Sequence, residues 1–261
     1  MSKAIMVQGT ASGVGKTILT LALCRILRQD GYRAAPFKAQ NMTTNTCFTK
    51  DGDEIAVSQW LQALAAEAEP SIDMNPIVLK PPFDHPRIAD SDTKLQIIMS
   101  AYTRLRERHD VIVIEGAGSP VELNLNNDDM VNMGLAKRAR APVLLVSDVD
   151  RGGVFASLYG TVALMGKSEM ALVKATIVNR FRGDPALFAD GVKILEDITK
   201  LPVAGIVPYI EINLPEEDSL FDNGKAGQTA DFKSQFDRIA DNARRHLNMK
   251  LIYDILSKGA Q

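Results

Sequence analysis

The stretch Gly9-Thr-Ala-Ser-Gly-Val-Gly-Lys-Thr17 decides the fold. It follows an apolar run at residues 4–8 and opens a segment with helical spacing, which is the context of a phosphate-binding loop. Its glycines let backbone N–H groups converge on phosphate oxygens at a helix N-terminus, with Lys16 placed for the phosphates and Thr17 for Mg2+. A Gly-rich turn with a surface lysine is the alternative. The residues predicted to bind nucleotide here are Gly9, Thr10, Gly13, Val14, Gly15, Lys16, Thr17 and Ile18.

Six short runs rich in β-branched residues are each followed by a helical pattern. They are residues 4–8, 33–37, 111–115, 142–147, 174–179 and 202–207. Such alternation predicts parallel strands joined by crossover helices, and runs that are apolar throughout are typical of strands covered on both faces. The sequence therefore predicts an α/β fold of the P-loop NTPase class, with a mostly parallel sheet and helices on both faces.

The organisation outside these runs is read from composition and spacing. Residues 39–110 form a long insertion with a predicted helix at about 54–69, and residues 1–220 are expected to form one P-loop domain. Residues 221–261 are expected to be a linker and one amphipathic helix that packs on the domain or on a partner. The apolar residues of that helix are Phe236, Ile239, Ala243, Leu247, Leu251 and Ile255.

Composition excludes several function classes. The chain has 261 residues, 46% of them hydrophobic, and a formal net charge of -2, so it can bury a full core and has no basic footprint for nucleic acid. No apolar run is long enough to cross a bilayer. Cys24 and Cys47 show neither CxxC spacing nor a nearby His cluster, which argues against a disulfide framework and a zinc site. We expect a cytoplasmic protein that binds neither nucleic acid nor membrane.

Several longer motifs follow the loop in order across residues 4 to about 220. They are Pro36-Phe-Lys-Ala-Gln-Asn-Met42, Met74-Asn-Pro-Ile-Val-Leu-Lys-Pro81, Ile114-Glu-Gly-Ala-Gly-Ser-Pro120, Asp148-Val-Asp-Arg-Gly-Gly-Val-Phe-Ala156, Val178-Asn-Arg-Phe-Arg-Gly-Asp184 and Pro215-Glu-Glu-Asp218. Together they resemble cobyric acid synthase, and the loop, with Thr10 at the usual first glycine, resembles that of dethiobiotin synthetase. The resemblance implies ATP- and Mg2+-dependent amidation of carboxylates of cobyrinic acid a,c-diamide in cobalamin biosynthesis, with ammonia from a glutaminase domain.

The sequence departs from the family pattern in three places. It has no nucleophile-elbow pattern of the G-x-C-x-G kind, so we expect the chain alone not to hydrolyse glutamine and to depend on a separate glutaminase subunit or free ammonia. The stretch between Pro81 and Leu95 is short for the family. Val57 and Asn126 stand where the family has basic residues, cations that a polycarboxylate substrate would miss. We expect the substrate to be a corrinoid, with another polycarboxylate as the alternative. We also expect a homodimer.

Besides Lys16, which is predicted to be catalytic, three further charged residues are predicted to take part in the chemistry. Glu115 closes an apolar strand before small residues, which favours a role as a Mg2+ ligand, since hard oxygen donors suit that ion. Glu54 is a second candidate metal ligand by analogy with dethiobiotin synthetase, a solvated glutamate at a helix start being the alternative. Lys38 ends the second strand and is predicted to neutralise the γ-phosphoryl group and the incoming carboxylate, unless it is a solvated lysine.

Other strand ends are predicted to recognise the base and the substrate. Asn179 can pair with the donor and acceptor edges of adenine, with Arg180 beside it, and a turn-forming Asn is the alternative. Arg151 is expected to face substrate or phosphate, although a structural Asp–Arg pair would look the same. The remaining residues in matched motifs that are predicted to line the substrate site are Gln40, Asn41, Lys80, Ser119 and Glu122.

Two other functions are alternatives to amidation through an acyl phosphate. One is a dethiobiotin-synthetase-like ligase that phosphorylates a carbamate, against which the cobyric-type motifs argue. The other is a nucleotide-driven switch of the MinD or ParA kind, whose loop carries a signature lysine where this chain has Ala11. The sequence therefore favours a ligase.

Overall fold

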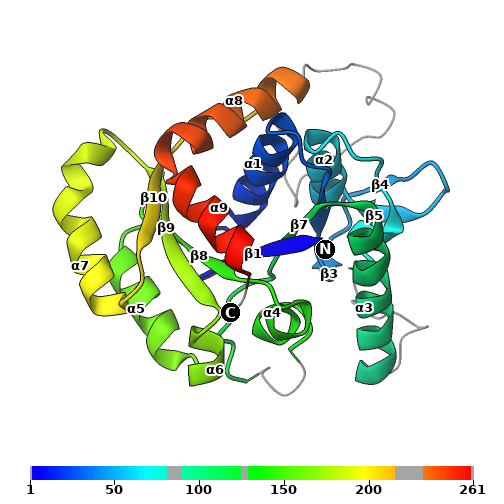
Figure 1. Ribbon diagram of the computed structural model, residues 1–261, viewed down its shortest axis with the longest axis horizontal. Coiled ribbons are helices and arrows are strands. Elements are labelled where there is room, and N and C mark those ends of the chain that lie inside the picture. The colour runs from blue at the N-terminus through cyan, green and yellow to red at the C-terminus, as the bar shows by residue number, and fades with distance from the viewer. Residues whose placement is uncertain (1, 81–89, 125–128, 215–231, 260–261) are drawn as a thin grey trace. The chain divides into compact units, whose positions relative to one another are not determined.

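The computed structural model describes residues 2–80, 90–124, 129–214 and 232–259 (Figure 1). The chain forms two compact units. The first comprises residues 1–2, 20–114 and 212–240, and the second comprises residues 3–19, 115–211 and 241–261. Two helices, α1 (Lys16–Gln29) and α8 (Phe232–His246), each contribute residues to both units.

The second unit is built on four parallel strands in the order β10-β9-β8-β1. They are β1 (Lys3–Gly9), β8 (Val143–Asp148), β9 (Val173–Phe181) and β10 (Val203–Pro208). In the register of β1 and β8, Met6 lies opposite Val143. Asp148 of β8 lies opposite Asn179 of β9, so the polar carboxyl ends of these two strands meet at one edge of the sheet. The strands predicted at these positions are confirmed, and the continuous burial of β8 fits a strand covered on both faces.

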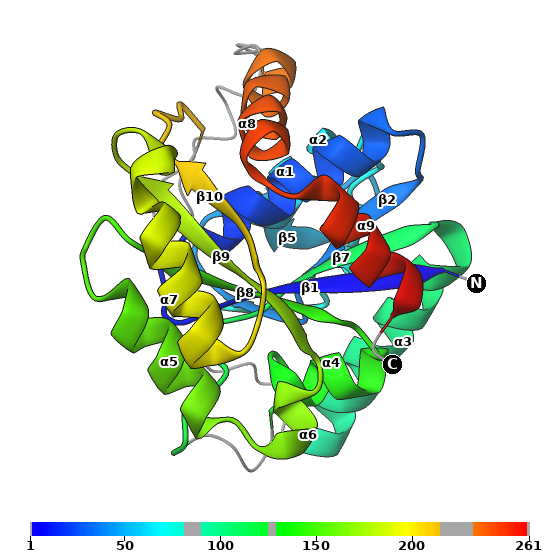
Figure 2. The same ribbon diagram turned by 60° about the vertical axis from the view of Figure 1, so that its left-hand side comes forward.

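Helices cover both sides of these four strands. Figure 2 shows α5 and α7 on one side and α9 on the other, with α9 against β1 and β10. The helices of this unit are α4 (Met133–Ala139), α5 (Val154–Leu164), α6 (Lys167–Met170), α7 (Ala189–Thr199), which follows the 3-10 turn Pro185–Phe188, and α9 (Met249–Lys258). The predicted α/β architecture is therefore present.

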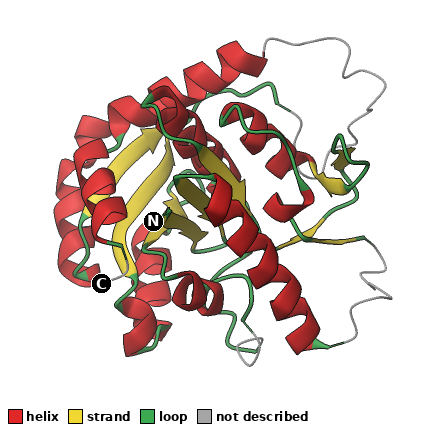
Figure 3. Ribbon diagram, turned by 45° about the vertical axis from the view of Figure 1, so that its right-hand side comes forward, coloured by secondary structure: helices red, strands yellow, loops and turns green. Residues whose placement is uncertain are grey.

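The first unit contains a pair of parallel strands and the long insertion. β2 (Ala34–Phe37) pairs with β7 (Val111–Glu115), whose last residue counts with the second unit. The insertion contributes α2 (Val57–Ala65), the 3-10 turn Ile72–Met74 and α3 (Ser91–Arg108). It also holds two short sheets, β3 (Gln40–Met42) with β6 (Ile77–Leu79) and β4 (Thr46–Phe48) with β5 (Glu54–Ala56) (Figure 3).

The predicted helix at about 54–69 is wrong at both ends. Residues 54–56 form strand β5, in which Glu54 lies opposite Phe48 of the antiparallel strand β4. The helix α2 ends at Ala65, and Glu67 takes a left-handed backbone conformation with φ of 51°. Glu54 is therefore a strand residue and does not begin a helix.

The predicted single C-terminal helix is two helices in the structure. The chain leaves the first helix at Leu247, which forms an isolated antiparallel bridge with Gly205 of β10. The backbone N–H of Asn248 donates to the carbonyl of Ala204 at 2.7 Å, and its side chain caps α9 by accepting from Leu251 N–H at 3.0 Å. A Cβ on Gly205 would lie 2.2 Å from the carbonyl oxygen of His246, so this close approach requires glycine. The break lets the chain dock on the edge strand.

Cys24 and Cys47 are both buried, and burial raises the pKa of the Cys47 thiol to about 11.

Over residues 2–80, 90–124, 129–214 and 232–259, no helix has the length and apolar character that a bilayer crossing requires.

A buried arginine ties three segments of the first unit together. Arg25 of α1 is 5% exposed and pairs with Glu67 at 3.0 Å and with Asp237 of α8 at 2.7 Å. Hydrogen bonds from Arg25 lower the pKa of both carboxyl groups. A carboxyl whose pKa is lower in the folded state stabilises the fold above its unfolded pKa and loses that contribution as pH falls through its folded pKa.

We predict that Asp237→Asn lowers stability by about 1 kcal/mol at neutral pH, a value discounted because the Asp237 side chain is 38% exposed. The thermal midpoint should fall by about 2–4 °C, and the difference from the wild type should shrink as pH falls below about 4, where the wild-type carboxylate is protonated. Asp254→Asn, which breaks an exposed pair with Lys250, is the matched control and should leave the midpoint unchanged. Equal midpoints for all three proteins would contradict the role of Arg25.

Candidate active site

The loop between β1 and α1 has the conformation of a phosphate-binding loop. Gly13 and Gly15 have positive φ values of 72° and 95°, which glycine adopts without strain. The Thr10 N–H donates to the carbonyl of Val146 at 2.9 Å, which fixes the start of the loop on β8. Backbone N–H groups at the start of α1 are thereby held at one place, as a bound phosphate requires.

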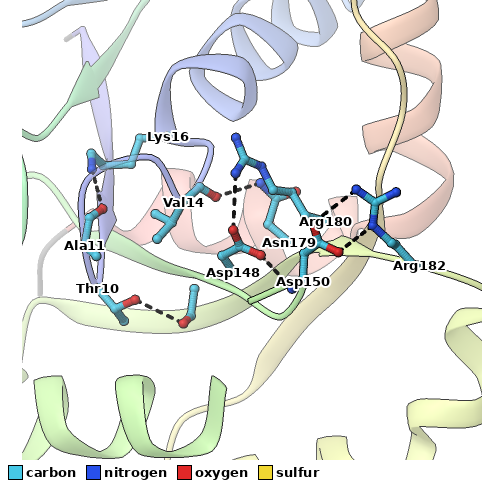
Figure 4. A network of polar contacts seen from close by, with 10 residues as sticks. Thr10, Ala11, Val14, Lys16, Asp148, Asp150, Asn179, Arg180 and Arg182 are labelled. Carbon is cyan, nitrogen blue, oxygen red and sulfur yellow. Dashed lines mark hydrogen bonds and ion pairs between the residues drawn. The ribbon is translucent and has the colours of Figure 1, made fainter. Parts of the chain in front are cut away.

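Lys16 folds back over this loop. Its Nζ donates to the carbonyl of Ala11 at 2.9 Å (Figure 4). It also donates to the carbonyl of Gly118 at 2.9 Å, and the residue is only 6% exposed. Gly118 follows β7, so one ammonium group connects the two segments that the sequence predicted to share a site. A bound phosphate would offer this ammonium stronger acceptors than the two neutral carbonyls.

Thr17 and Glu115 meet at the foot of the loop. The Thr17 hydroxyl donates to Oε1 of Glu115 at 2.8 Å, and Glu115 is 1% exposed. The two predicted metal ligands of this unit are thus within direct contact. No group of three or more His, Cys, Asp or Glu side chains able to hold a metal occurs in the part of the chain that the structure describes. A Mg2+ ion would fit this pair because it needs only one or two protein ligands when phosphate and water complete its shell.

The segment after Glu115 is held by Asn132, a residue that sequence reasoning missed. The Asn132 amide accepts from Ala117 N–H at 3.0 Å and donates to the carbonyls of Ala117 and Ser119 at 2.6 and 3.0 Å. Asp129 in turn accepts from the Asn132 N–H at 2.7 Å. The signal available in the sequence was an Asn directly before a helical segment, where capping residues are common. Asn132 thus positions the backbone that carries the Lys16 acceptor.

Asn179 and Arg180 lie at the end of β9. The Asn179 Nδ2 donates to the carbonyl of Val14 in the loop at 2.8 Å, and Arg180 has a positive φ of 59°. The Arg180 guanidinium pairs with Asp148, the last residue of β8, at 3.2 Å. The predicted base-recognition residue therefore contacts the phosphate loop directly (Figure 4).

The sequence left open whether Arg151 forms a structural ion pair with one of the neighbouring aspartates. In the structure both aspartates pair with other arginines. Asp148 pairs with Arg180, and Asp150 pairs with Arg182, whose guanidinium lies 4.1 Å from the centre of the Tyr209 ring. The hydrogen bond from Arg182 lowers the pKa of Asp150. Arg151 is exposed, and its Nη2 would be 4.0 Å from a Cβ on Gly13. The guanidinium of Arg151 thus faces the phosphate loop.

The other predicted substrate residues of the second unit differ in exposure. Ser119 is buried, and its hydroxyl accepts from Val121 N–H at 3.3 Å. Glu122 is exposed. Only Glu122 of these two presents its side chain to solvent.

The predicted residues of the first unit differ in burial and in the contacts they make. Lys38 directly follows β2 and is 6% exposed, while Gln40 is half-buried in β3. Asn41 is buried, and its Nδ2 donates to Gln59 Oε1 at 3.0 Å, so its amide holds the start of α2. Glu54 accepts from Lys80 and from the Thr46 hydroxyl. Partial burial disfavours the charged form of Glu54, but these two contacts outweigh it and lower its pKa.

The chain is similar to known proteins in both sequence and fold. A family model described as AAA domain matches residues 3–216. Cobyric acid synthase of Lachnoclostridium phytofermentans is 48% identical over 241 residues, covering 84% of this chain and 47% of that protein. The same enzyme of Listeria monocytogenes is 46% identical over 242 residues, covering 86% and 47%. The chain therefore spans about half the length of the curated relatives it matches.

Among solved structures, the signal recognition particle receptor FtsY from Elizabethkingia anophelis has a TM-score of 0.50 at 20% identity, covering 90% of this chain and 65% of that one. This likeness concerns the fold alone. The resemblance to cobyric acid synthase that the ordered motifs indicated is confirmed by the relatives. The chain belongs to the AAA domain family, and it is similar to cobyric acid synthases over about half of their length.

Proposed function

We propose that this protein binds ATP with Mg2+ and activates a carboxylate for amidation, as a ligase of the cobyric acid synthase type. The observation that carries the proposal is the contact between Thr17 and Glu115 at 2.8 Å beneath the loop that Lys16 covers. It brings two oxygen ligands and an ammonium group to one helix N-terminus. The similarity to cobyric acid synthases supports the choice of reaction.

In the proposed reaction, a carboxylate oxygen of the substrate attacks the γ-phosphorus of ATP, and the bond to the β–γ bridging oxygen breaks to release ADP. Ammonia then attacks the acyl phosphate carbon, and inorganic phosphate leaves. The loop N–H groups and Lys16 neutralise charge that develops on the phosphoryl oxygens. Mg2+ held by Thr17 and Glu115 would supply further charge neutralisation there. No side chain of the protein forms a covalent bond.

Roles for the remaining residues follow from their contacts. We assign adenine recognition to Asn179 with Arg180, and phosphate or substrate contact to the exposed Arg151. Lys38 is assigned to neutralising the carboxylate and the transferring group. The substrate residues are proposed to be Gln40, Asn41, Lys80, Ser119 and Glu122. Glu54, whose carboxylate accepts from Lys80 and Thr46, is proposed as the second acidic metal ligand in addition to Glu115.

The substrate we propose is cobyrinic acid a,c-diamide, in cobalamin biosynthesis. The chain is incubated with MgATP, this corrinoid and either ammonium or glutamine, and products are read by mass. We expect amide formation and ADP release with ammonium, and no product with glutamine. The separate glutaminase subunit and the homodimer stay predictions that co-purification and mass in solution would test.

Other outcomes distinguish the rival functions. ADP release that needs bicarbonate and an amine would favour a dethiobiotin-synthetase-like ligase that phosphorylates a carbamate. ATP hydrolysis that ignores every carboxylate but responds to lipid vesicles would favour a nucleotide switch. Undetectable binding of ATP in magnesium buffer would overturn the proposal altogether.

A further inference from the structure

The side chain of Asn179 joins the end of β9 to the middle of the phosphate loop. Its Nδ2 lies 2.8 Å from the carbonyl oxygen of Val14, across a buried contact between residues 165 positions apart in the chain. Asn179 itself is 6% exposed. A buried hydrogen bond of this kind constrains the position of the loop, because breaking it would leave the Val14 carbonyl without its partner.

The loop is shaped to accept this contact. A Cβ at Gly15 would lie 2.1 Å from the Asn179 Nδ2, a distance that no pair of non-bonded atoms can adopt. Gly15 also has a φ of 95°, which side-chain-bearing residues rarely adopt. The glycine is therefore needed both for the loop conformation and for the approach of the amide.

The amide retains capacity after this bond is made. An Asn side chain has two N–H donors and a carbonyl oxygen with two lone pairs. The Val14 carbonyl takes one donor, so one N–H and Oδ1 remain. One donor and one acceptor side by side are what the edge of adenine requires. Asn179 can therefore hold the loop and contact a base at the same time.

The backbone beside Asn179 is held in an unusual conformation. Arg180 has a φ of 59°, which is uncommon for a residue with a side chain and costs energy that the surrounding structure must supply. The Asp148 carboxylate pairs with the Arg180 guanidinium, and the Val149 N–H donates to the Asn179 carbonyl at 3.1 Å. These contacts fix the direction in which the Asn179 side chain leaves the strand.

We propose that Asn179 is a positioning residue for phosphate binding: its amide holds the loop at Val14 and Gly15 in the conformation that receives the phosphate chain. This inference rests on the proposed nucleotide binding and goes beyond the assignment of Asn179 to adenine. It makes a distinct prediction, because a residue that only reads the base cannot affect a ligand without a base.

The test compares MgATP with magnesium tripolyphosphate, which has the phosphate chain and no base. Asn179→Ala removes both functions of the amide, and Asn179→Asp keeps its shape and one acceptor while removing the N–H donor. We expect both variants to bind tripolyphosphate about tenfold more weakly than the wild type, as loss of one buried hydrogen bond predicts. Binding is measured by calorimetry and, for tripolyphosphate, also by competition with ATP.

Thr176→Val is the matched control. Thr176 lies three residues earlier on β9, is fully buried, and its hydroxyl has no hydrogen-bond partner among the residues that the structure describes. The variant should bind both ligands as the wild type does. In the ligand-free protein, amide hydrogen exchange at residues 13–16 should be faster in both Asn179 variants and unchanged in the control. Because hydrogen exchange needs no ligand, it tests the inference even if tripolyphosphate binds too weakly for its affinities to be compared.

Two results would overturn the inference while leaving nucleotide binding intact. One is an Asn179→Ala protein that binds ATP more weakly but tripolyphosphate as well as the wild type does. The other is unchanged loop exchange in both variants, even if the thermal midpoint falls, since that pattern belongs to a merely structural residue. A wild-type protein that binds neither ligand would refute the proposed function itself.

Discussion

Lys16→Ala is expected to lower ammonium-dependent product formation by about 100- to 1,000-fold at saturating MgATP. The buried ammonium of Lys16 now holds two carbonyl oxygens at 2.9 Å, one of them from the segment after Glu115. With nucleotide bound, it would act on the β- and γ-phosphates, where its charge matters most as the phosphoryl group transfers. The measurement is the initial rate of ADP release with substrate and ammonium present.

The control for this substitution is Lys3→Ala, because Lys3 is the exposed first residue of β1, at the end of that strand away from the phosphate-binding loop. Its rate should equal that of the wild type. A Lys16→Ala protein that retains more than a tenth of the wild-type rate would contradict the role we give to Lys16.

Glu115→Gln is expected to raise the Mg2+ concentration needed for half-maximal activity by about tenfold or more, since charge on a hard oxygen ligand is what the ion prefers. The amide oxygen can still accept from the Thr17 hydroxyl that lies 2.8 Å from Glu115 Oε1, so the local fold should persist. Affinity for nucleotide without metal should change little. The measurement is a magnesium titration at saturating ATP.

Glu107→Gln serves as the control, because Glu107 is exposed on α3. It should give the wild-type titration. If Glu115→Gln also gives that curve, the buried carboxylate has a structural role and is no metal ligand.

The strands were predictable because burial on both faces leaves a direct trace in the sequence. When both sides of a sheet are covered, apolar side chains are favoured at every position of the strand, and the run 143–146 of β8 is apolar throughout. The loop at residues 9–17 was predictable because its glycines mark the positive φ values at Gly13 and Gly15, which glycine adopts without strain.

The insertion was less predictable because its short strands depend on pairing. Residues 54–56 form a strand only because β4 lies beside them, and three residues are too few for an alternating pattern. Leu247, Leu251 and Ile255 keep helical spacing across the break between α8 and α9. Spacing alone therefore could not show that Leu247 pairs with β10.

The residues of the site also differ in how far the sequence could predict them. Lys16, Thr17 and Glu115 carry their chemistry within short motifs, and the structure brings them to one place. Asn132 acts through three hydrogen bonds to residues 117 and 119, which no local pattern encodes. Asn179 and Val14 lie 165 positions apart in the chain, and no local pattern encodes a contact over that separation. The sequence therefore predicted that Asn179 recognises the base, but it did not predict the contact with the loop.

The burial of both cysteines has a practical consequence. Thiolate is the form that alkylating reagents attack, and a thiol with a pKa near 11 is almost wholly protonated at neutral pH. Maleimide dyes should therefore react slowly with Cys47, and the fully buried Cys24 is shielded by its packing. A fluorophore could then be attached to a new surface cysteine, for example by Lys193→Cys on α7, without first removing the native thiols.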